Sequence, residues 1–414
     1  MFMLVDCDNF FVSCEKLFQP GLNGRPIVVL SNNDGCVVSR SYEAKGMGIP
    51  MGAPYFKIEK QLHAAGGEAL SSNYELYADM SRRLMGHLRN GFSSVDVYSI
   101  DEAFIDIGTV ADYQKLGQQL QQNIVREIGI PVSIGIAATK TLCKIAGDKA
   151  KKQDKVAVLT RDEEIDRELA QTEVIDVWGV GRHLCRKLNF RGIFTALELK
   201  NYDLGRLRQV FGLNLERTAQ ELRQISCLDD HAEDATQQSI ISSRSFDVEV
   251  CHYERLKAIL AEFVDNACLR LREQQATARG IAVFIETNRF DRQPLYQKQI
   301  LVPLEHPSAL TSRFVQAMAA GLAQIFQPGR RYKRAGIMLS GVRPATDPQE
   351  DFWENRNAVD KEQKLMAAVD AINHKMGRKT LFLGSQAPGL QHYIRRNHKS
   401  PSYTTDWQAL PLVS

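Results

Sequence analysis

Three acidic residues at two distant places in the chain are of the type that binds a hard divalent cation. Asp6 ends a short apolar segment, and Asp101 and Glu102 lie between the apolar runs 95–98 and 103–107. If these side chains converge, two carboxylates about 4 Å apart repel by roughly 4 kcal/mol at an effective dielectric constant near 20, so a cation has to sit among them. Carboxylates without histidine or cysteine ligands select Mg²⁺ or Mn²⁺, and two such ions support in-line phosphoryl transfer.

The spacing of Asp101 and Glu102 sets a condition on the backbone. Neighbouring side chains of a straight strand point to opposite faces, so the two acids can share a ligand only at a bend. We therefore predict a hairpin with its tip at 99–102. This tip lacks the Gly or Asn that a relaxed two-residue turn prefers, and broken local rules are expected at functional sites. From these residues alone, however, an ordinary solvated turn is the simpler interpretation.

The elements that would position the acids form an α+β unit. Residues 2–6 predict a strand that has to join a later sheet to be buried, and Phe10–Phe18 predicts a helix. Ser-Asn-Asn-Asp-Gly between 27–30 and 36–38 favours a hairpin, because Asn, Asp and Gly tolerate positive φ. The other expected elements are helices at 73–90, 111–128 and 139–152 and strands at 132–136 and 156–159.

A helical region, a linker and a basic domain follow. Glycines break short helices between 172 and 225, where no strand pattern occurs, and the polar, acidic stretch 227–240 predicts a linker. Between 240 and 345, 15 Lys and Arg exceed nine Asp and Glu, which gives +6, whereas the rest of the chain nets −3. We expect a basic surface there. The predicted order is strand 241–249, helix 253–273, strands 280–286 and 296–302, helix 308–326 and strand 332–341, a βαββαβ pattern.

Composition excludes several classes of protein. A length of 414 residues predicts two to four domains, and 44% hydrophobic residues are enough for ordinary cores. The eight cysteines have no spacing typical of a zinc site, so reduced thiols are expected. The sequence has neither the pattern of a signal peptide nor an apolar run of roughly 18 residues, so we expect a cytoplasmic protein that does not enter a membrane.

An ordered series of motifs resembles the Y-family translesion DNA polymerases, most closely their UmuC branch. The resemblance spans nearly the whole chain, and so long a series does not arise by chance. The matching segments are DCDNFF (6–11), NNDGC (32–36), YEAK (42–45), SNYELY (72–77), YSIDEAF (98–104), GIA (135–137), TKTL (139–142), DVWGVGR (176–182), SRSF (243–246) and GRKTL (377–381).

The resemblance implies a right-hand polymerase with an added DNA-binding domain. It places the palm at 1–10 and 75–170, the fingers at 11–74, the thumb with a helix-hairpin-helix at 171–226, a linker at 227–240, the βαββαβ little finger at 241–343 and a tail at 344–414 that carries partner-binding segments. These bounds agree with those expected from the residue patterns.

The resemblance also assigns roles in the site. Asp6, Asp101 and Glu102 match the catalytic carboxylates that bind two Mg²⁺, and the Cys7 carbonyl would be a further ligand. Phe11 matches the aromatic steric gate that excludes a ribose hydroxyl, although the UmuC branch has Tyr there; Phe10 is expected in the core. The predicted triphosphate contacts are Ser39, Tyr42, Lys45 and Lys151, with Lys45 replacing an Arg of the broad family.

Nucleic-acid and protein contacts follow by the same comparison. Gly179, Gly181 and Arg182 match a turn whose backbone N–H groups approach a DNA phosphate. The little-finger contacts would be Arg244, Arg289, Arg331, Lys333 and Arg334, and the degenerate sliding-clamp peptide would use Gln349, Phe352 and Trp353.

The function predicted is error-prone, DNA-templated synthesis from dNTPs past damaged bases. By resemblance, the partners are primer-template DNA, a UmuD-like subunit, the RecA filament and the sliding clamp, in a damage response. Two alternatives stay open at this point. One is another palm-type nucleotidyltransferase or cyclase, which needs neither thumb nor little finger, and the other is a DNA-binding scaffold that has lost catalysis.

Overall fold

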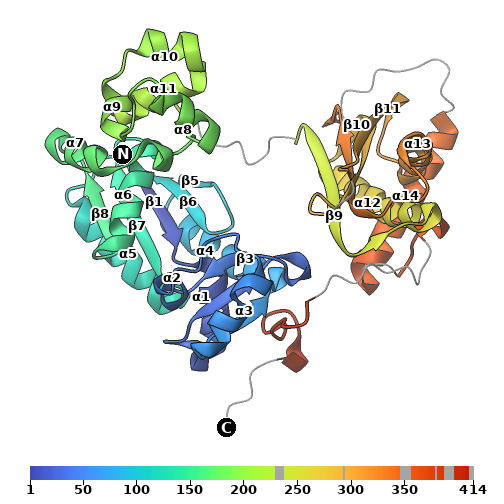
Figure 1. Ribbon diagram of the computed structural model, residues 1–414, viewed down its shortest axis with the longest axis horizontal. Coiled ribbons are helices and arrows are strands. Elements are labelled where there is room, and N and C mark those ends of the chain that lie inside the picture. The colour runs from blue at the N-terminus through green and yellow to red at the C-terminus, as the bar shows by residue number, and fades with distance from the viewer. Residues whose placement is uncertain (229–236, 292–293, 346–355, 378–379, 387–395, 410–414) are drawn as a thin grey trace. The chain divides into compact units, whose positions relative to one another are not determined.

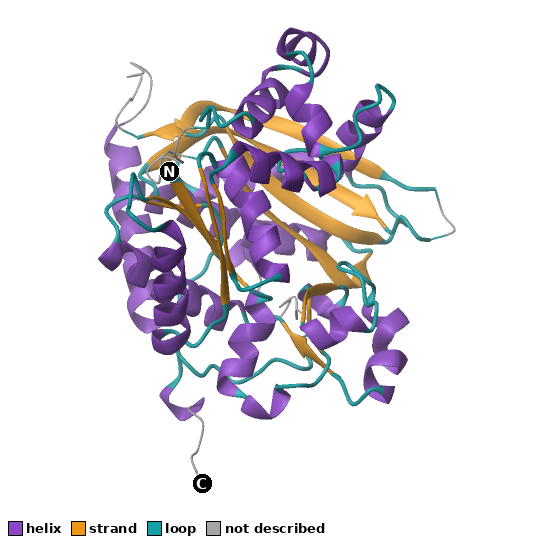
Figure 2. Cartoon of the chain, turned by 90° about the vertical axis from the view of Figure 1, so that its left-hand side faces the viewer, coloured by secondary structure: helices purple, strands orange, loops and turns teal. Residues whose placement is uncertain are grey.

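The computed structural model describes residues 1–228, 237–291, 294–345, 356–377, 380–386 and 396–409 (Figure 1). The chain divides into two compact units. The first comprises Met1–Glu233 with Arg396–Ser414, and the second comprises Asp234–Arg395. Each unit has hydrophobic cores of its own, and Figure 2 shows strands of each sheet lying side by side with helices against them.

A five-stranded sheet forms the middle of the first unit. Its order is β5 (Val95–Val97), β6 (Glu102–Asp106), β1 (Phe2–Cys7), β7 (Val132–Ala137) and β8 (Val156–Leu159). The predicted strand β1 is buried because it pairs antiparallel with both β6 and β7. The helices associated with this sheet are α4 (Tyr74–Gly91), α5 (Tyr113–Glu127) and α6 (Lys140–Lys152). Helix α6 lies close to β7, since a Cβ at Gly135 would come within 2.3 Å of the Cys143 carbonyl oxygen.

The region predicted as fingers contains helix α1 (Phe10–Phe18) and a three-stranded sheet. The sheet order is β3 (Val37–Arg40), β2 (Ile27–Leu30) and β4 (Glu68–Ser71), and the helices are α2 (Tyr42–Gly46) and α3 (Tyr55–Ala64). The hairpin between β2 and β3 confirms the prediction, and its turn holds Asn33 and Asp34 at φ values of 61° and 50°. Strand β4, which pairs parallel with β2, was not predicted.

The region predicted as thumb is helical throughout, as expected. It follows α7 (Asp162–Gln171) and contains α8 (Arg182–Asn189), α9 (Ala196–Asn201), α10 (Leu204–Phe211) and α11 (Leu213–Leu222). It shares a core with α6 and the five-stranded sheet. The buried Glu221 carboxylate accepts the Thr141 N–H at 3.0 Å and so ties α11 to the start of α6.

The second unit contains the predicted βαββαβ domain. Its elements are β9 (Ser239–Val250), α12 (Tyr253–Glu273), β10 (Ala276–Thr287), β11 (Gln297–Ser308), α13 (Thr311–Ile325) and β12 (Tyr332–Ser340), with strand order β11-β10-β12-β9. The predicted boundary at 240/241 is wrong by two residues. Ser239 and Ile240 already pair with Ser340 and Leu339, because Ile240 is buried in the core and needs that pairing.

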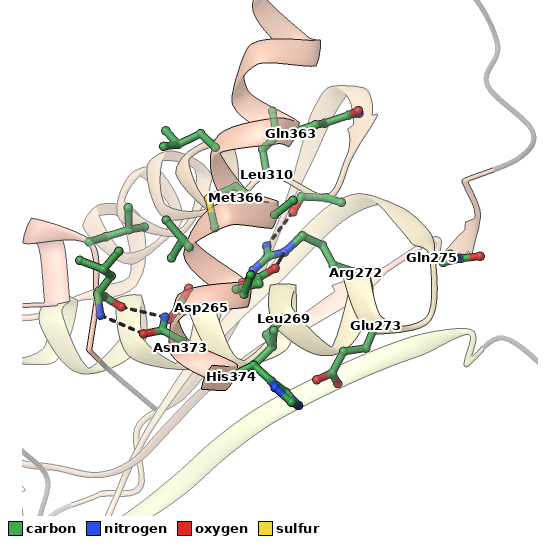
Figure 3. A pocket seen from close by; sticks show the side chains of 18 of the residues that line it. Asp265, Leu269, Arg272, Glu273, Gln275, Leu310, Gln363, Met366, Asn373 and His374 are labelled. Carbon is green, nitrogen blue, oxygen red and sulfur yellow. Dashed lines mark hydrogen bonds and ion pairs between the residues drawn. The ribbon is translucent and has the colours of Figure 1, made fainter. Parts of the chain in front are cut away.

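The predicted tail 344–414 is not one structural part. Strand β13 (Arg343–Pro344) pairs with β10, and helix α14 (Arg356–Met376) also belongs to the second unit, whereas residues 396–409 belong to the first. A cavity of about 840 Å³ lies against α14 and α12 (Figure 3). There the Arg272 guanidinium donates to both oxygens of Asp370, at 2.6 and 2.9 Å, and so anchors α14.

Within the described residues, none of the helices has the length and apolarity needed to cross a lipid bilayer. All eight cysteines are free thiols.

Candidate active site

The two acidic segments meet where β1 ends and β6 begins. Asp6 pairs across the strands with Glu102, and the Cys7 N–H donates to the Asp101 carbonyl oxygen at 3.0 Å. The Ser99 hydroxyl holds the turn, since it donates to Asp101 Oδ1 at 2.6 Å and accepts the Asp101 N–H. The predicted hairpin tip is therefore confirmed, and all three acids line one cavity of about 460 Å³ together with Cys7.

Lysines hold two of the three carboxylates. Lys151 Nζ donates to Asp6 Oδ2 at 2.7 Å, and Lys144 Nζ donates to Glu102 Oε2 at 2.8 Å. Both lysines come from α6. The Lys144 ammonium also lies 4.4 Å from the ring centre of Tyr98 and 5.5 Å from that of Trp178. The sequence did not single out Lys144, and only its place on one helix, one turn before Asp148 and two turns before Lys151, could have indicated it.

The electrostatics of the three acids differ. Burial raises the pKa of Asp6 to about 7, against the lowering effect of Lys151, and the neighbouring Glu102 raises it further. Burial also raises the pKa of Asp101, which the Ser99 hydroxyl opposes. Burial would raise the pKa of Glu102 too, but the hydrogen bonds from Lys144 and Asp6 lower it below the usual value. Of the three, Asp6 is therefore the acid whose proton a cation would have to displace near neutral pH.

The donor set fits hard divalent cations, although the side chains do not stand in a metal-binding arrangement. In the part of the chain that the structure describes, no group of three or more His, Cys, Asp or Glu side chains is arranged to hold an ion. The ion pairs with Lys151 and Lys144 engage one oxygen each of Asp6 and Glu102, oxygens that a metal would use. Carboxylates and a backbone carbonyl at one cavity are the ligands that Mg²⁺ prefers.

The two adjacent phenylalanines have different surroundings. Phe10 is buried in the core and only 3% exposed. The half-buried Phe11 lines the acidic cavity and stacks on Tyr77, with ring centres 4.4 Å apart and an angle of 12° between ring planes. It also meets Tyr74 edge-on at 6.1 Å. Phe10 also borders this cavity, so the two rings differ in burial, with Phe10 in the core and Phe11 the more exposed.

The four predicted triphosphate contacts line the same cavity as the acids: Ser39, Tyr42, Lys45 and Lys151. Burial and the nearby Arg40 lower the pKa of Lys45. A further lysine, Lys155, was not predicted; its ammonium donates to the Tyr42 hydroxyl at 3.1 Å and to the fully buried Asp8 carboxylate at 2.9 Å. Lys155 has a φ of 67°, an uncommon conformation for a residue with a Cβ.

The predicted thumb turn has the expected conformation. Gly179 has a φ of 88°, and Gly181 precedes the first residue of α8, Arg182, as its N-cap. A Cβ at Gly181 would meet nothing within 4 Å, so the backbone there is open to approach. Trp178 lies on the other side of the turn, where its indole N–H donates to the Tyr98 hydroxyl at 3.0 Å and links the thumb to the acidic hairpin.

The predicted basic residues of the second unit do not all share a face. Arg334 is exposed and lies over the Phe284 ring, whereas Arg244 pairs in register with the buried Ala335 and points to the helix side, over Phe263. Most of the group is engaged with acceptors of the same unit: Arg289 with Glu286, Arg331 with Glu249 and Asp291, Arg334 with Glu286, and Lys333 with the Asp247 carbonyl.

The predicted clamp-binding residues Gln349, Phe352 and Trp353 lie outside the described residues.

Comparison with known proteins finds one family in both units. Residues 5–148 match the impB/mucB/samB family, residues 237–352 match the C-terminal domain of that family, and residues 363–413 match a domain of unknown function, DUF4113. The chain is 38% identical to the protein UmuC of Salmonella typhimurium strain LT2, with 100% of both chains covered. It is 27% identical to the DNA polymerase IV of Moorella thermoacetica, over 92% of this chain and 94% of that one.

Solved structures show the same fold. A Y-family DNA polymerase chimera, Dbh-Dpo4(243-245)-Dbh, matches with a TM-score of 0.68 at 21% identity and covers 83% of this chain and 99% of its own. The DinB structure from Sulfolobus solfataricus matches with a TM-score of 0.52, also at 21% identity, over 83% of this chain and 99% of that chain.

Proposed function

Because the chain belongs to the impB/mucB/samB family, we propose that it is a Y-family DNA polymerase that copies damaged templates with low fidelity. The substrates are dNTPs and primer-template DNA, and the reaction is nucleotidyl transfer to the primer 3′-hydroxyl. Full-length similarity to UmuC at 38% identity and similarity to DNA polymerase IV support this proposal. The α+β right-hand fold and the reduced thiols fit an enzyme that works on DNA in the cytoplasm.

The observation that carries the proposal is the convergence of two acidic segments at one cavity. Asp6 lies opposite Glu102, and the Asp101 backbone is hydrogen-bonded to Cys7, so the acids come together from positions 95 residues apart in sequence. Asp6, Asp101, Glu102 and the Cys7 carbonyl would hold two Mg²⁺, or Mn²⁺, which supply Lewis-acid activation of the hydroxyl and charge neutralisation of the triphosphate.

Other residues of the cavity bind and orient the nucleotide. If metal held the carboxylates, the Lys151 ammonium that pairs with Asp6 at the cavity would be available to the triphosphate. Ser39 and Tyr42 supply hydroxyl donors, and Lys45 and Lys155 supply positive charge. Positioning and charge neutralisation account for most of the catalysis of such a transfer.

Phe11 selects the sugar. Its ring lines the cavity and is fixed by the Tyr77 ring behind it, so a ribose 2′-hydroxyl would collide with a rigid wall. Gly179, Gly181 and Arg182 hold a DNA phosphate, and the basic residues of the second unit bind the duplex through its backbone. We keep the UmuD-like subunit, the RecA filament and the sliding clamp as proposed partners.

Primer extension tests the proposal directly. Wild type is given primer-template DNA, dNTPs and Mg²⁺, with the proposed partners, and compared with Asp101→Ala. The variant should lose roughly 10³-fold or more in rate, because several kcal/mol of charge stabilisation disappear and about 1.4 kcal/mol is tenfold.

The matched control is Asp106→Ala, which removes an exposed acid from the same strand β6 and should leave the rate unchanged. No template-directed product from wild type would refute the polymerase function. Equal activity in wild type and Asp101→Ala would refute the assignment of the acids.

A further inference from the structure

The segment 396–403, which we call the C-terminal strap, packs on the back of the helices that carry the steric gate. It belongs to the first unit although the residues before it belong to the second, and it lies within the domain of unknown function at 363–413. Lys399 forms a parallel bridge with Ser71 at the end of β4. The Ser71 N–H donates to the His398 carbonyl oxygen, and the His398 N–H donates to the Ser71 hydroxyl, both at 3.0 Å.

The strap reaches the N-terminus of α4 through a buried amide. Asn73 is the N-cap of α4, since its side chain accepts the Leu76 N–H. Its Nδ2 donates to the Ser400 hydroxyl at 2.9 Å and to the carbonyl oxygens of Ser400 and Pro401 at 3.3 and 3.1 Å. Asn73 is fully buried. The strap therefore fixes the residue from which α4 begins.

Two basic residues of the strap add to this contact. Lys399 and Arg396 pair with Glu75 in the first turn of α4, at 3.2 and 3.7 Å, and the Arg396 guanidinium lies 5.7 Å from the ring centre of Tyr74. Tyr74 is the ring that meets Phe11 edge-on. The charged contacts are half-exposed and contribute modestly to stability, but they set the position of the first turn.

The strap also contacts α1, the helix of the gate itself. Phe11, Glu15 and Phe18 recur along one side of α1 at spacings of four and three residues. Tyr403 stacks on Phe18, with ring centres 4.9 Å apart and an angle of 5°. Glu15 is fully buried, and the Tyr77 hydroxyl donates to it at 2.6 Å. Burial raises the pKa of Glu15, which the hydrogen bonds from Tyr77 and Ser400 and the charge of Lys399 oppose.

These contacts form a continuous path from the strap to the gate. The Ser400 hydroxyl accepts from Asn73, the Tyr77 N–H donates to the Asn73 carbonyl oxygen at 3.1 Å, and the Tyr77 ring lies flat against Phe11 while Glu15 accepts from its hydroxyl. We propose that the C-terminal strap positions Phe11 through Asn73 and Tyr77 and so sets the discrimination between deoxyribose and ribose. The residues of the strap are positioning residues, and the inference rests on the proposed polymerase function and on Phe11 as the gate.

The test measures the ratio of dNTP to rNTP incorporation. This ratio does not depend on how much of the enzyme is folded. Single-nucleotide incorporation gives kcat/KM for a dNTP and for the rNTP of the same base, in the full chain with primer-template DNA. Tyr403→Ala should lower the dNTP/rNTP ratio about tenfold, since misplacement by 1 Å can cost 10²-fold and the displacement here is smaller. Ser400→Ala, which deletes one hydroxyl, should lower it in the same direction.

Two controls separate positioning from general destabilisation. Tyr403→Phe keeps the ring that stacks on Phe18 and should retain the wild-type ratio. Trp407→Ala changes an aromatic residue of the same C-terminal region that is 89% exposed, and should also retain it. If Tyr403→Ala does not fold, Ser400→Ala decides the question.

A second readout does not depend on catalysis. Amide hydrogen exchange in the first turn of α4 should be faster in Ser400→Ala than in wild type, because the Asn73 cap loses a partner. Wild type that makes no templated product would refute the polymerase function but not the strap contact. A ratio within twofold of wild type in both alanine variants, with exchange at α4 raised, would make the strap merely structural and overturn the inference.

Discussion

The acidic cleft and the little-finger sheet both pair cations with carboxylates, but they use these pairs differently. In the cleft, Asp6 and Asp8 are 10% and 0% exposed and each is held by a lysine. At the ends of the sheet strands, Arg289 and Arg331 are 61% and 54% exposed, against 36% and 33% for Lys151 and Lys155, although Glu286 beside Arg289 is only 7% exposed. Buried pairs depend on geometry and on every partner atom, whereas exposed pairs are screened and individually weak. Substitutions in the cleft should therefore abolish a catalytic step. Substitutions on the sheet should only weaken DNA binding by degrees.

Of the substitutions that test this comparison, the largest effect is expected for Phe11, the cleft residue that we propose excludes ribose. Phe11→Ala should raise ribonucleotide incorporation relative to deoxynucleotide incorporation by roughly 10²-fold, the order of discrimination that one steric group provides. The measurement is the kcat/KM ratio on the same primer-template. Phe10→Leu, which preserves apolar bulk in the core, is the control for helix damage. Unchanged sugar discrimination in Phe11→Ala would mean that the gate is misassigned.

A smaller effect should follow the protonation of Asp6. Its pKa is raised to about 7, so below that pH a cation has to displace a proton, and apparent Mg²⁺ affinity should rise about tenfold per pH unit before levelling off above it. By the same linkage, the folded state binds this proton more tightly than the unfolded chain. Without metal, the free energy of unfolding should then fall as pH rises from about 4 to about 7.

Calorimetric titration with Mg²⁺ and thermal unfolding from pH 5 to 8 measure both trends. Asp6→Asn should remove the pH dependence of unfolding in this window. A Mg²⁺ affinity that is flat from pH 5 to 8 in wild type would show that Asp6 carries no such proton.

The smallest effect is expected on the sheet. Six neutralised phosphates would give a slope near −5 for log affinity against log salt, and Arg334→Ala should reduce that slope by about one. The matched control is Arg255→Ala on α12, which is exposed but lies on the helix layer. Fluorescence anisotropy with duplex DNA at several salt concentrations measures the slope. Equal slopes for Arg334→Ala and wild type would remove this face from the DNA-binding surface.

The sequence predicted most helices, strands and turns well, because these elements follow from the pattern of neighbouring residues. Alternating and continuous apolar runs placed β1, β6 and α6, and Asn-Asn-Asp-Gly placed the turn between β2 and β3. The family resemblance predicted from ordered motifs is confirmed by full-length similarity at 38% identity. The order of helices and strands along the chain in the little finger followed from the same patterns.

The rest depends on tertiary contacts that local patterns do not encode. Lys144 and Lys155 gain their partners only when α6 and the loop after it fold over β1. Arg244 faces the helices because one step of register decides the face of a strand. The strap could not be predicted, since Asn73 and Ser400 are 327 residues apart.

The number of divalent ions that the acids hold is the most direct test of the account. Titration with Mn²⁺, followed by electron paramagnetic resonance in the presence of primer-template DNA and a non-hydrolysable dNTP analogue, gives that number. We predict two tightly bound ions per wild-type chain and a loss of at least one in Asp101→Asn. Wild type that binds no ion at this site, or Asp101→Asn with an unchanged titration, would contradict the central claim.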